Sequence, residues 1–233
     1  MTEGIDISGH QNPAGMHWDR IKAAGIEFVV AKSHEGALYL DSAFKAHVKD
    51  ALAEDLLVGS YIYFWGSVDP KEDTILTWVD SLAEATVQFV ALDVEVPSPG
   101  MAAVEYNFWW TKDAAGKPAL RKENLPLIQE RVLKTRELLM QRMGRKILLY
   151  TGIPAWQALD LGHTAFNKDD LWWAQYYKAP TLAPKKPLIH QYSGSGFVDG
   201  VCDAAGRAVY VDRNHTDLSR DDLVAWANNT LIA

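Results

Sequence analysis

The sequence predicts an α/β protein, an irregular and flattened (β/α) barrel of about eight strands with few helices in its second half. Short apolar segments bounded by turn residues recur along the whole chain of 233 residues, as expected for many short strands. In the first part of the chain they alternate with segments whose apolar residues recur at helical spacing. The run from Val87 to Val94 is almost continuously apolar, which indicates a central strand covered on both faces.

Each predicted element ends at a recognisable turn or capping residue. Pro70 and Pro126 fall in the first turns of two helices, and Gly25 closes the first helix. The predicted strands are 4–8, 27–32, 57–65, 87–95, 146–151, 171–176, 187–193 and 208–214. The predicted helices are 18–24, 44–52, one from Pro70 to about 82, 124–143 and 220–231. The segment 97–121 breaks this alternation, is too aromatic for a disordered linker, and is predicted to be an ordered loop over the site.

Composition limits the classes of function. A length of 233 residues and 48% hydrophobic content predict one domain over 1–233 with a substantial core. The formal charge of -7 argues against a nucleic-acid partner. Cys202 is the single cysteine, so no internal disulfide forms. The sequence contains neither a signal-peptide pattern nor an apolar run long enough for membrane insertion, which predicts synthesis in the cytoplasm.

Two carboxylates end the central strand. Asp93 and Glu95 lie two positions apart, so both side chains point to the same side, with backbones roughly 6 to 7 Å apart. Each charge raises the pKa of the other, which suits chemistry that uses one protonated acid and one ionised acid. A solvated turn or a helix N-cap is the plainer interpretation. The residues Pro97 to Gly100 argue against the cap, because no helix can begin at once.

Acids and aromatic residues gather at the other strand ends, where barrel enzymes carry their function. Acids flanked by flat rings suit glycoside hydrolysis, which needs a proton donor, a carboxylate facing a cationic transition state, and surfaces on which sugars stack. About half of these rings are expected to serve only core packing. The candidate residues are Asp6, Asp93, Glu95 and Asp212 for catalysis and Tyr63, Trp65, Trp173, Tyr176, Gln191 and Tyr192 for substrate binding.

Six segments, in order along the chain, resemble the glycoside hydrolase family 25 lysozymes. They are Gly-Ile-Asp-Ile-Ser from Gly4, Ala-Lys-Ser-His-Glu-Gly from Ala31, Gly-Ser-Tyr from Gly59, Leu-Asp-Val-Glu from Leu92, His-Gln-Tyr-Ser from His190 and Val-Asp-Arg-Asn from Val211. The resemblance implies a muramidase that cuts the β-1,4 bond between N-acetylmuramic acid and N-acetylglucosamine, acts on peptidoglycan glycan strands, and needs no cofactor or metal. It implies Glu95 as acid and base, Asp93 as its partner, and Asp6 and Asp212 as further acids.

The resemblance carries further expectations, beginning with a single catalytic domain over 1–233 that acts as a monomer, without a separate cell-wall-binding domain. It suggests a phage or prophage endolysin without a leader, released to the wall through a holin. We expect net retention by substrate assistance, with Glu95 protonated and Asp93 ionised near its normal range. The chain departs from the family pattern at His190, where a tryptophan is common, in the long segment 97–121, and in the turn 202–207, which places subsite details in question.

Two other classes of function are open to the sequence. A metal-dependent hydrolase could use Asp6, His10, Asp93 and Asp212 as ligands, although no helical His-Glu-x-x-His pattern supports it. A glycan-binding module would need the rings but not the paired acids. The rings of Tyr106, Phe108, Trp109 and Trp110 have two equal interpretations, a glycan subsite or a local hydrophobic plug.

Overall fold

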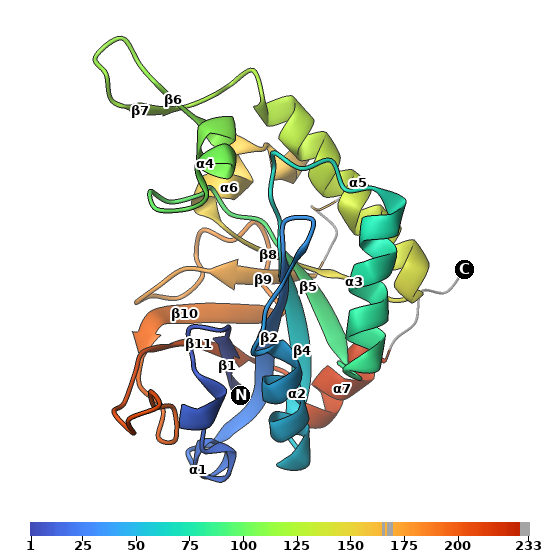
Figure 1. The fold of residues 1–233 in the computed structure, drawn as a ribbon, viewed down its shortest axis with the longest axis vertical. Helices are drawn as coiled ribbons and strands as arrows, with labels where there is room; N and C mark the ends of the chain where they lie inside the picture. The colour runs from blue at the N-terminus through green and yellow to red at the C-terminus, as the bar shows by residue number, and fades with distance from the viewer. Residues whose placement is uncertain (165, 167–169, 229–233) are drawn as a thin grey trace.

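The main sheet of the protein closes on itself into a barrel. In the computed structural model, which describes residues 1–164, 166 and 170–228, β1 pairs with β2 on one side and with β11 on the other (Figure 1). The strands follow one another as β1 (Thr2–Ile7), β2 (Ile26–Glu35), β4 (Leu57–Tyr63), β5 (Phe89–Asp93), β8 (Leu148–Gly152), β9 (Leu171–Ala174), β10 (Ile189–Gly196) and β11 (Val211–Thr216). The short β3 (Tyr39–Leu40) pairs with the end of β2 in the antiparallel direction. The predicted barrel of about eight strands is thus confirmed.

The last strand runs against its neighbours. Strand β11 is antiparallel to both β1 and β10, whereas the neighbouring pairs from β1 through β10 are parallel. This strand therefore departs from the parallel order of a regular (β/α) barrel, and it begins at Val211 rather than at the predicted 208. Asp212 consequently lies at the start of its strand. The reversal brings this start to the barrel mouth, where Asp212 stands directly opposite Asp6.

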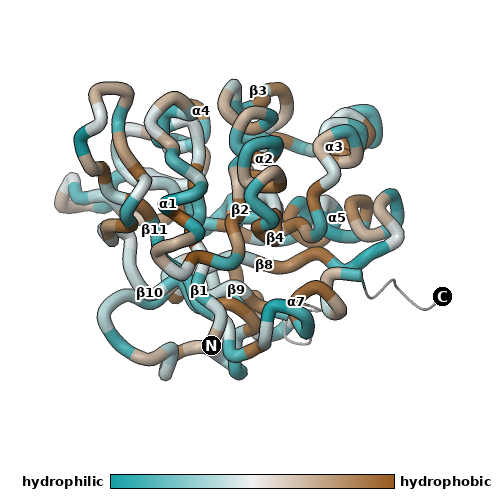
Figure 2. The backbone as a smooth tube through the Cα atoms, turned by 90° about the horizontal axis from the view of Figure 1, so that it is seen from below, coloured by the Kyte–Doolittle hydropathy of each residue, from teal (hydrophilic) through white to brown (hydrophobic). Residues whose placement is uncertain are grey.

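Helices cover only part of the barrel. They contact β2, β4 and β8, and hydrophobic residues are concentrated along those strands (Figure 2). The helices are α1 (Trp18–Ala23), α2 (Phe44–Ala53), α3 (Glu72–Glu84), α4 (Ala103–Trp109), α5 (Leu125–Met143), α6 (Ile153–Ala158) and α7 (Arg220–Ala227), with 3-10 turns at Pro13–Gly15 and Leu161–His163. The predicted helix 220–231 is observed to Ala227, and 229–231 lie outside the described residues. None of the helices in the described part of the chain is long and apolar enough to cross a bilayer.

The segment 97–121 is ordered, as predicted, but it contains structure that the pattern does not indicate. It forms α4 and a hairpin of β6 (Trp110–Lys112) and β7 (Pro118–Leu120). Trp109 is fully buried in the core between helices and barrel. Its indole and the backbone N–H of Gly66 both donate to the buried Glu105 carboxylate, at 2.6 Å each. Trp109 thus fits the plug interpretation and not the subsite.

The end of the barrel away from the mouth is filled by aromatic rings and closed by α7. Phe28 and Phe89 are fully buried there, together with Leu223 and Ala227 of α7. Each ring lies over a glycine on the adjacent strand: Gly4 pairs with Phe28 and Gly59 pairs with Phe89. A Cβ atom at Gly59 would come within 2.4 Å of the Phe89 ring. Glycine is therefore required where the ring crosses the neighbouring backbone.

We expect Gly59→Ala to lower the free energy of unfolding by about 1 to 3 kcal/mol, because the buried ring has no free space into which to move. Urea unfolding at 25 °C measures the change. Gly162→Ala is the matched control, since its added Cβ meets nothing closer than 3.4 Å and φ is not positive. Equal stability of Gly59→Ala and the wild type would show that the ring can be displaced at no cost.

Candidate active site

The four predicted acids meet in one cavity at the barrel mouth. The cavity has a volume of about 290 Å³ and is lined by residues of β1, β2, β4, β5, β8, β9 and β11 and of the segment after β5. Its lining residues are Asp6, Ser8, His10, Lys32, Tyr61, Tyr63, Asp93, Glu95, Ser98, Met101, Tyr150, Trp172, Tyr176 and Asp212. The arrangement brings Asp6, Asp93 and Asp212 from three separate strands, and Glu95 from two positions beyond one of them, into a single hollow with tyrosine and tryptophan rings.

Asp6 is held by two side-chain amides. Gln191 Nε2 donates to Asp6 Oδ2 at 2.8 Å, and Asn214 Nδ2 donates to the same oxygen at 2.7 Å. The amide of Gln191 is itself oriented, because its Oε1 accepts the hydroxyls of Tyr150 at 2.8 Å and Tyr176 at 2.9 Å. Gln191 is 1% exposed. It therefore ties β10 to the carboxylate of β1 and to two rings of the cavity wall.

Burial raises the pKa values of both Asp6 and Asp212. Burial raises the pKa of Asp6 well above its usual value, the charge of Asp212 raises it further, and the Gln191 and Asn214 amides lower it. Burial also raises the pKa of Asp212. Because the two residues are in register on antiparallel strands, the pair favours states in which one of them holds a proton.

Asp93 and Glu95 differ in their surroundings. Asp93 is 5% exposed, and its Oδ1 is buried without a hydrogen-bond partner among the described residues. Burial, then Glu95, then Asp6 raise the pKa of Asp93 well above its usual value, while Lys32 lowers it. Glu95 is half-buried. Burial raises its pKa most, and a hydrogen bond from Tyr150 lowers it.

The expectation of a nearly normal pKa for Asp93 is therefore wrong. The sequence predicts a raised pKa for Glu95, which holds, but a nearly normal one for Asp93. Asp93 is the last residue of a strand enclosed by β4 and β8, so its carboxyl group lies inside the barrel mouth rather than on its rim. Desolvation disfavours the charged form of such a group.

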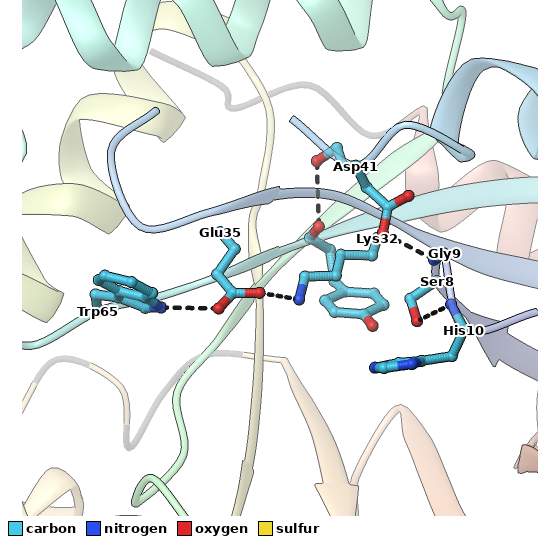
Figure 3. A network of polar contacts seen from close by, with 9 residues as sticks. Ser8, Gly9, His10, Lys32, Glu35, Asp41 and Trp65 are labelled. Carbon is cyan, nitrogen blue, oxygen red and sulfur yellow. Dashed lines mark hydrogen bonds and ion pairs between the residues drawn. The ribbon is translucent and has the colours of Figure 1, made fainter. Parts of the chain in front are cut away.

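One cation lies beside these acids. Lys32 on β2 lines the cavity, lowers the pKa values of Asp93 and Glu95, and has its ammonium 5.2 Å from the centre of the Tyr63 ring. A bulge between Lys32 and His34 allows Glu35 to reach back and form an ion pair with Lys32. Trp65 Nε1 donates to the other oxygen of Glu35 at 3.2 Å, so the three side chains form a row (Figure 3).

The loop after β1 is held by a second set of polar contacts. Asp41 Oδ2 accepts a hydrogen bond from the backbone N–H of Gly9 at 2.8 Å. The hydroxyl oxygen of Ser8 accepts one from the backbone N–H of His10 at 3.3 Å (Figure 3). These contacts fix the turn that follows Asp6. They place Ser8 and His10 on the wall of the cavity.

Only two of the six predicted substrate-binding residues line the cavity. Tyr63 and Tyr176 line the cavity. Trp65 holds Glu35 instead, and Gln191 is a buried support. The other two face away from the cavity: Trp173 is fully buried in the outer core, and Tyr192 lies on the outer face of β10, where its hydroxyl donates to Glu3 at 2.7 Å.

Sequence reasoning missed several members of the cavity wall. Trp172, not Trp173, points inward, since alternate residues of β9 face opposite sides. Tyr150 and Lys32 lie at or next to the ends of the predicted strands 146–151 and 27–32, neither of which supplied a candidate residue. Asn214 lies two positions after Asp212, a spacing that places both on one face and could have revealed it.

The acids of the cavity do not form a metal-binding set in the part of the chain that the structure describes. Among the residues that the structure describes, no group of three or more histidine, cysteine, aspartate or glutamate side chains is placed to hold a metal ion. His10, a ligand in the metal-dependent alternative, lines the cavity with Asp6, Asp93 and Asp212 without completing such a set.

We expect Gln191→Met to lower both kcat and stability. The substitution keeps the approximate volume but removes the acceptor of two tyrosine hydroxyls and one of the two donors to Asp6. An unsatisfied buried hydroxyl costs about 1 to 3 kcal/mol. Steady-state kinetics and urea unfolding measure the two effects, with the exposed Gln157→Met as control. Wild-type kcat in Gln191→Met would show that the orientation of Asp6 does not matter.

Comparison with known proteins agrees with this geometry. Residues 5–201 match the model of glycosyl hydrolases family 25. Lysozyme M1 of Streptomyces globisporus is 25% identical over 235 residues, covering 98% of this chain and 72% of its own. The crystal structure of a bacterial lysozyme from Streptomyces coelicolor is similar, with a TM-score of 0.72, 23% identity and 98% of both chains covered. The CTP1L endolysin has a TM-score of 0.68 at 17% identity, over 97% of this chain and 70% of that one.

The family match covers most of the chain, which therefore belongs to glycosyl hydrolase family 25 and is a glycoside hydrolase of the lysozyme, or muramidase, type.

Proposed function

We propose that the protein hydrolyses the β-1,4 bond between N-acetylmuramic acid and N-acetylglucosamine in peptidoglycan, with Glu95 as the proton donor. One observation carries the proposal: Glu95 lies two positions from Asp93 in a cavity that holds four acids, and burial raises its pKa. A raised pKa keeps the carboxyl group protonated at a pH at which an ordinary glutamate is ionised. The rings of Tyr63, Trp172 and Tyr176 provide surfaces for the sugars.

The proposed mechanism is substrate-assisted and retains the configuration at the anomeric carbon. The oxygen of the substrate's 2-acetamido group attacks that carbon while Glu95 gives its proton to the leaving oxygen. Asp93 faces the acetamido N–H with the oxygen that lacks a partner among the described residues, and as a carboxylate it stabilises the positive charge that develops on this group. Glu95, now ionised, then takes a proton from water, which opens the ring intermediate.

The release of sugar reducing ends tests this function. Purified protein should lower the turbidity of a peptidoglycan suspension and release reducing ends that belong to muramic acid. Release of free amino groups without reducing ends would identify an amidase or peptidase and reject the proposal. Activity should persist in EDTA, because two carboxyl groups suffice as acid and base.

The biological setting that we propose is lysis of a bacterial host by a phage-encoded enzyme made in the cytoplasm and released through a holin. The fold similarity to the CTP1L endolysin supports such a role without assigning it. Expression of the chain inside bacteria tests it. Lysis should follow only when a holin is co-expressed, and lysis by the chain alone would reject the requirement for a pore.

A further inference from the structure

A second cavity lies on the outer face of the strands that carry the catalytic acids. Along β10, Gln191 points into the barrel, whereas His190 and Tyr192 point outward. Along β11, Asn214 points inward and His215 outward. The outer residues line a hollow of about 430 Å³ that we call the outer groove, formed mainly by Glu3, Tyr177, Pro180, His190, Tyr192 and His215.

The groups on the wall of the outer groove are already fixed in position. Glu3 Oε2 accepts the Tyr192 hydroxyl at 2.7 Å and the Arg213 guanidinium at 2.9 Å. The ring of His215 lies 5.3 Å from that of Tyr192 and 5.0 Å from that of His190. His190 is 4% exposed and packs beneath these rings, its Nε2 donating to the carbonyl of Gln175 at 2.8 Å. The walls are thus preorganised, which lowers the cost of binding.

Tyr177 presents a free aromatic face at the edge of the outer groove. It is 82% exposed, although its backbone is anchored by an N–H bond to the carbonyl of Tyr192 at 3.1 Å. Its φ of 63° is a conformation that costs energy for a residue with a side chain. The preceding residue, Tyr176, lines the catalytic cavity, and the two rings lie 6.3 Å apart. Tyr176 thus lines the catalytic cavity and Tyr177 lines only the outer groove, so the two sites adjoin at this pair of residues.

The chemistry of the outer groove selects its occupant. The barrel is closed, so β1, β10 and β11 offer no free strand edge to which a peptide could add. The charges are mixed, since the Glu3 carboxylate and Lys178 both line the groove and the guanidinium of Arg213 is paired with Glu3, so the groove does not select an anionic ligand. Flat tyrosine faces beside a carboxylate and an imidazole instead match a pyranose ring, which has apolar faces and hydroxyl groups at its edge.

From these contacts we infer that the outer groove binds a saccharide unit of the same glycan strand, beyond the unit held in the catalytic cavity, with Tyr177 as its stacking platform. The inference rests on the proposed function for the identity of the strand. Such a site would strengthen attachment to the insoluble wall without taking part in bond cleavage, since a second contact on one strand raises the effective concentration of the first.

Binding and cleavage can be measured separately. In a Glu95→Gln background, Tyr177→Ala should raise the apparent Kd for insoluble peptidoglycan about 3- to 10-fold, because the variant loses one aromatic contact with the sugar. In the background with Glu95 intact, Tyr177→Ala should leave kcat/KM unchanged on a soluble tetrasaccharide of alternating N-acetylglucosamine and N-acetylmuramic acid. Tyr177→Trp should bind the wall at least as tightly as the parent. Tyr210→Ala is the matched control, a tyrosine that is 59% exposed and lines neither cavity.

Two results would overturn the inference: unchanged wall binding in Tyr177→Ala, or an equal loss on the tetrasaccharide, which would place Tyr177 in the catalytic cavity. Wall binding is read on inactive protein and does not depend on cleavage. Absence of reducing ends with wild-type protein would instead reject the proposed function. The two failures are therefore distinguishable.

Discussion

Replacing Glu95 by glutamine is expected to abolish turnover, lowering kcat by at least about 10²- to 10⁴-fold, the usual contribution of a positioned general acid. The amide has nearly the same shape but no proton to give to the leaving oxygen. Glu95 is half-buried and its neighbours keep their positions, so fold and glycan binding should be preserved. Release of reducing ends measures kcat, and a binding isotherm on insoluble peptidoglycan measures retention of substrate.

The pH dependence adds a second test of Glu95. A general acid must be protonated, so activity should fall as pH rises through its pKa, and that basic limb should lie above the ordinary value of about 4.5 because burial raises the pKa. The residual activity of Glu95→Gln should lack this limb. Glu84→Gln, at an exposed glutamate paired with Lys45, is the control. A basic limb that persists in Glu95→Gln would remove Glu95 from the role of acid.

The barrel could be predicted because its strands are marked at both ends. Parallel strands buried on both faces have continuous apolar sequences, and polar residues follow them at the mouth, as with Asp93 and Glu95. Since all such strand ends meet at one edge, residues distant in sequence can be assigned to one site without knowing their contacts. Asp6, Asp93 and Glu95 lie in the cavity for this reason, whereas Asp212 reaches it from the start of the reversed β11.

The direction of β11 could not be predicted from the local sequence. An apolar strand looks the same in either direction, and only its partners β1 and β10 show that it is reversed. The facing of Trp172 and Trp173 was equally ambiguous, because two adjacent tryptophans on a strand buried on both sides carry no alternation. Sequence patterns also do not show long-range hydrogen bonds. The contact of Gln191 with Asp6 spans 185 positions.

Replacing Asp93 by asparagine is expected to slow turnover severely and, at the same time, to stabilise the fold at neutral pH. In the transition state a carboxylate at this position faces positive charge, which offsets the cost of ionising a buried acid. The amide supplies no charge, and the loss should be about 10²- to 10³-fold in kcat, the size seen when one preorganised electrostatic contact is removed. KM should change less than kcat.

The gain in stability follows from the raised pKa of Asp93. A folded-state pKa above the unfolded value of about 3.9 means that the native state binds the proton more tightly. Its stabilising contribution is complete below the unfolded pKa and is lost as pH rises through the folded one. Asparagine does not titrate, so Asp93→Asn should lack this loss and unfold at a higher temperature than the wild type at neutral pH.

A control with the opposite sign makes the test specific. Lys134 lowers the pKa of the exposed Asp69, so Asp69→Asn should be slightly less stable than the wild type above the unfolded pKa. Thermal unfolding of the three proteins between about pH 4 and pH 8, the range over which a raised carboxyl pKa acts, gives the comparison. If Asp93→Asn keeps wild-type kcat, Asp93 does not carry the catalytic charge. If its stability falls with pH as steeply as that of the wild type, Asp93 does not bear the cost of burying a charge.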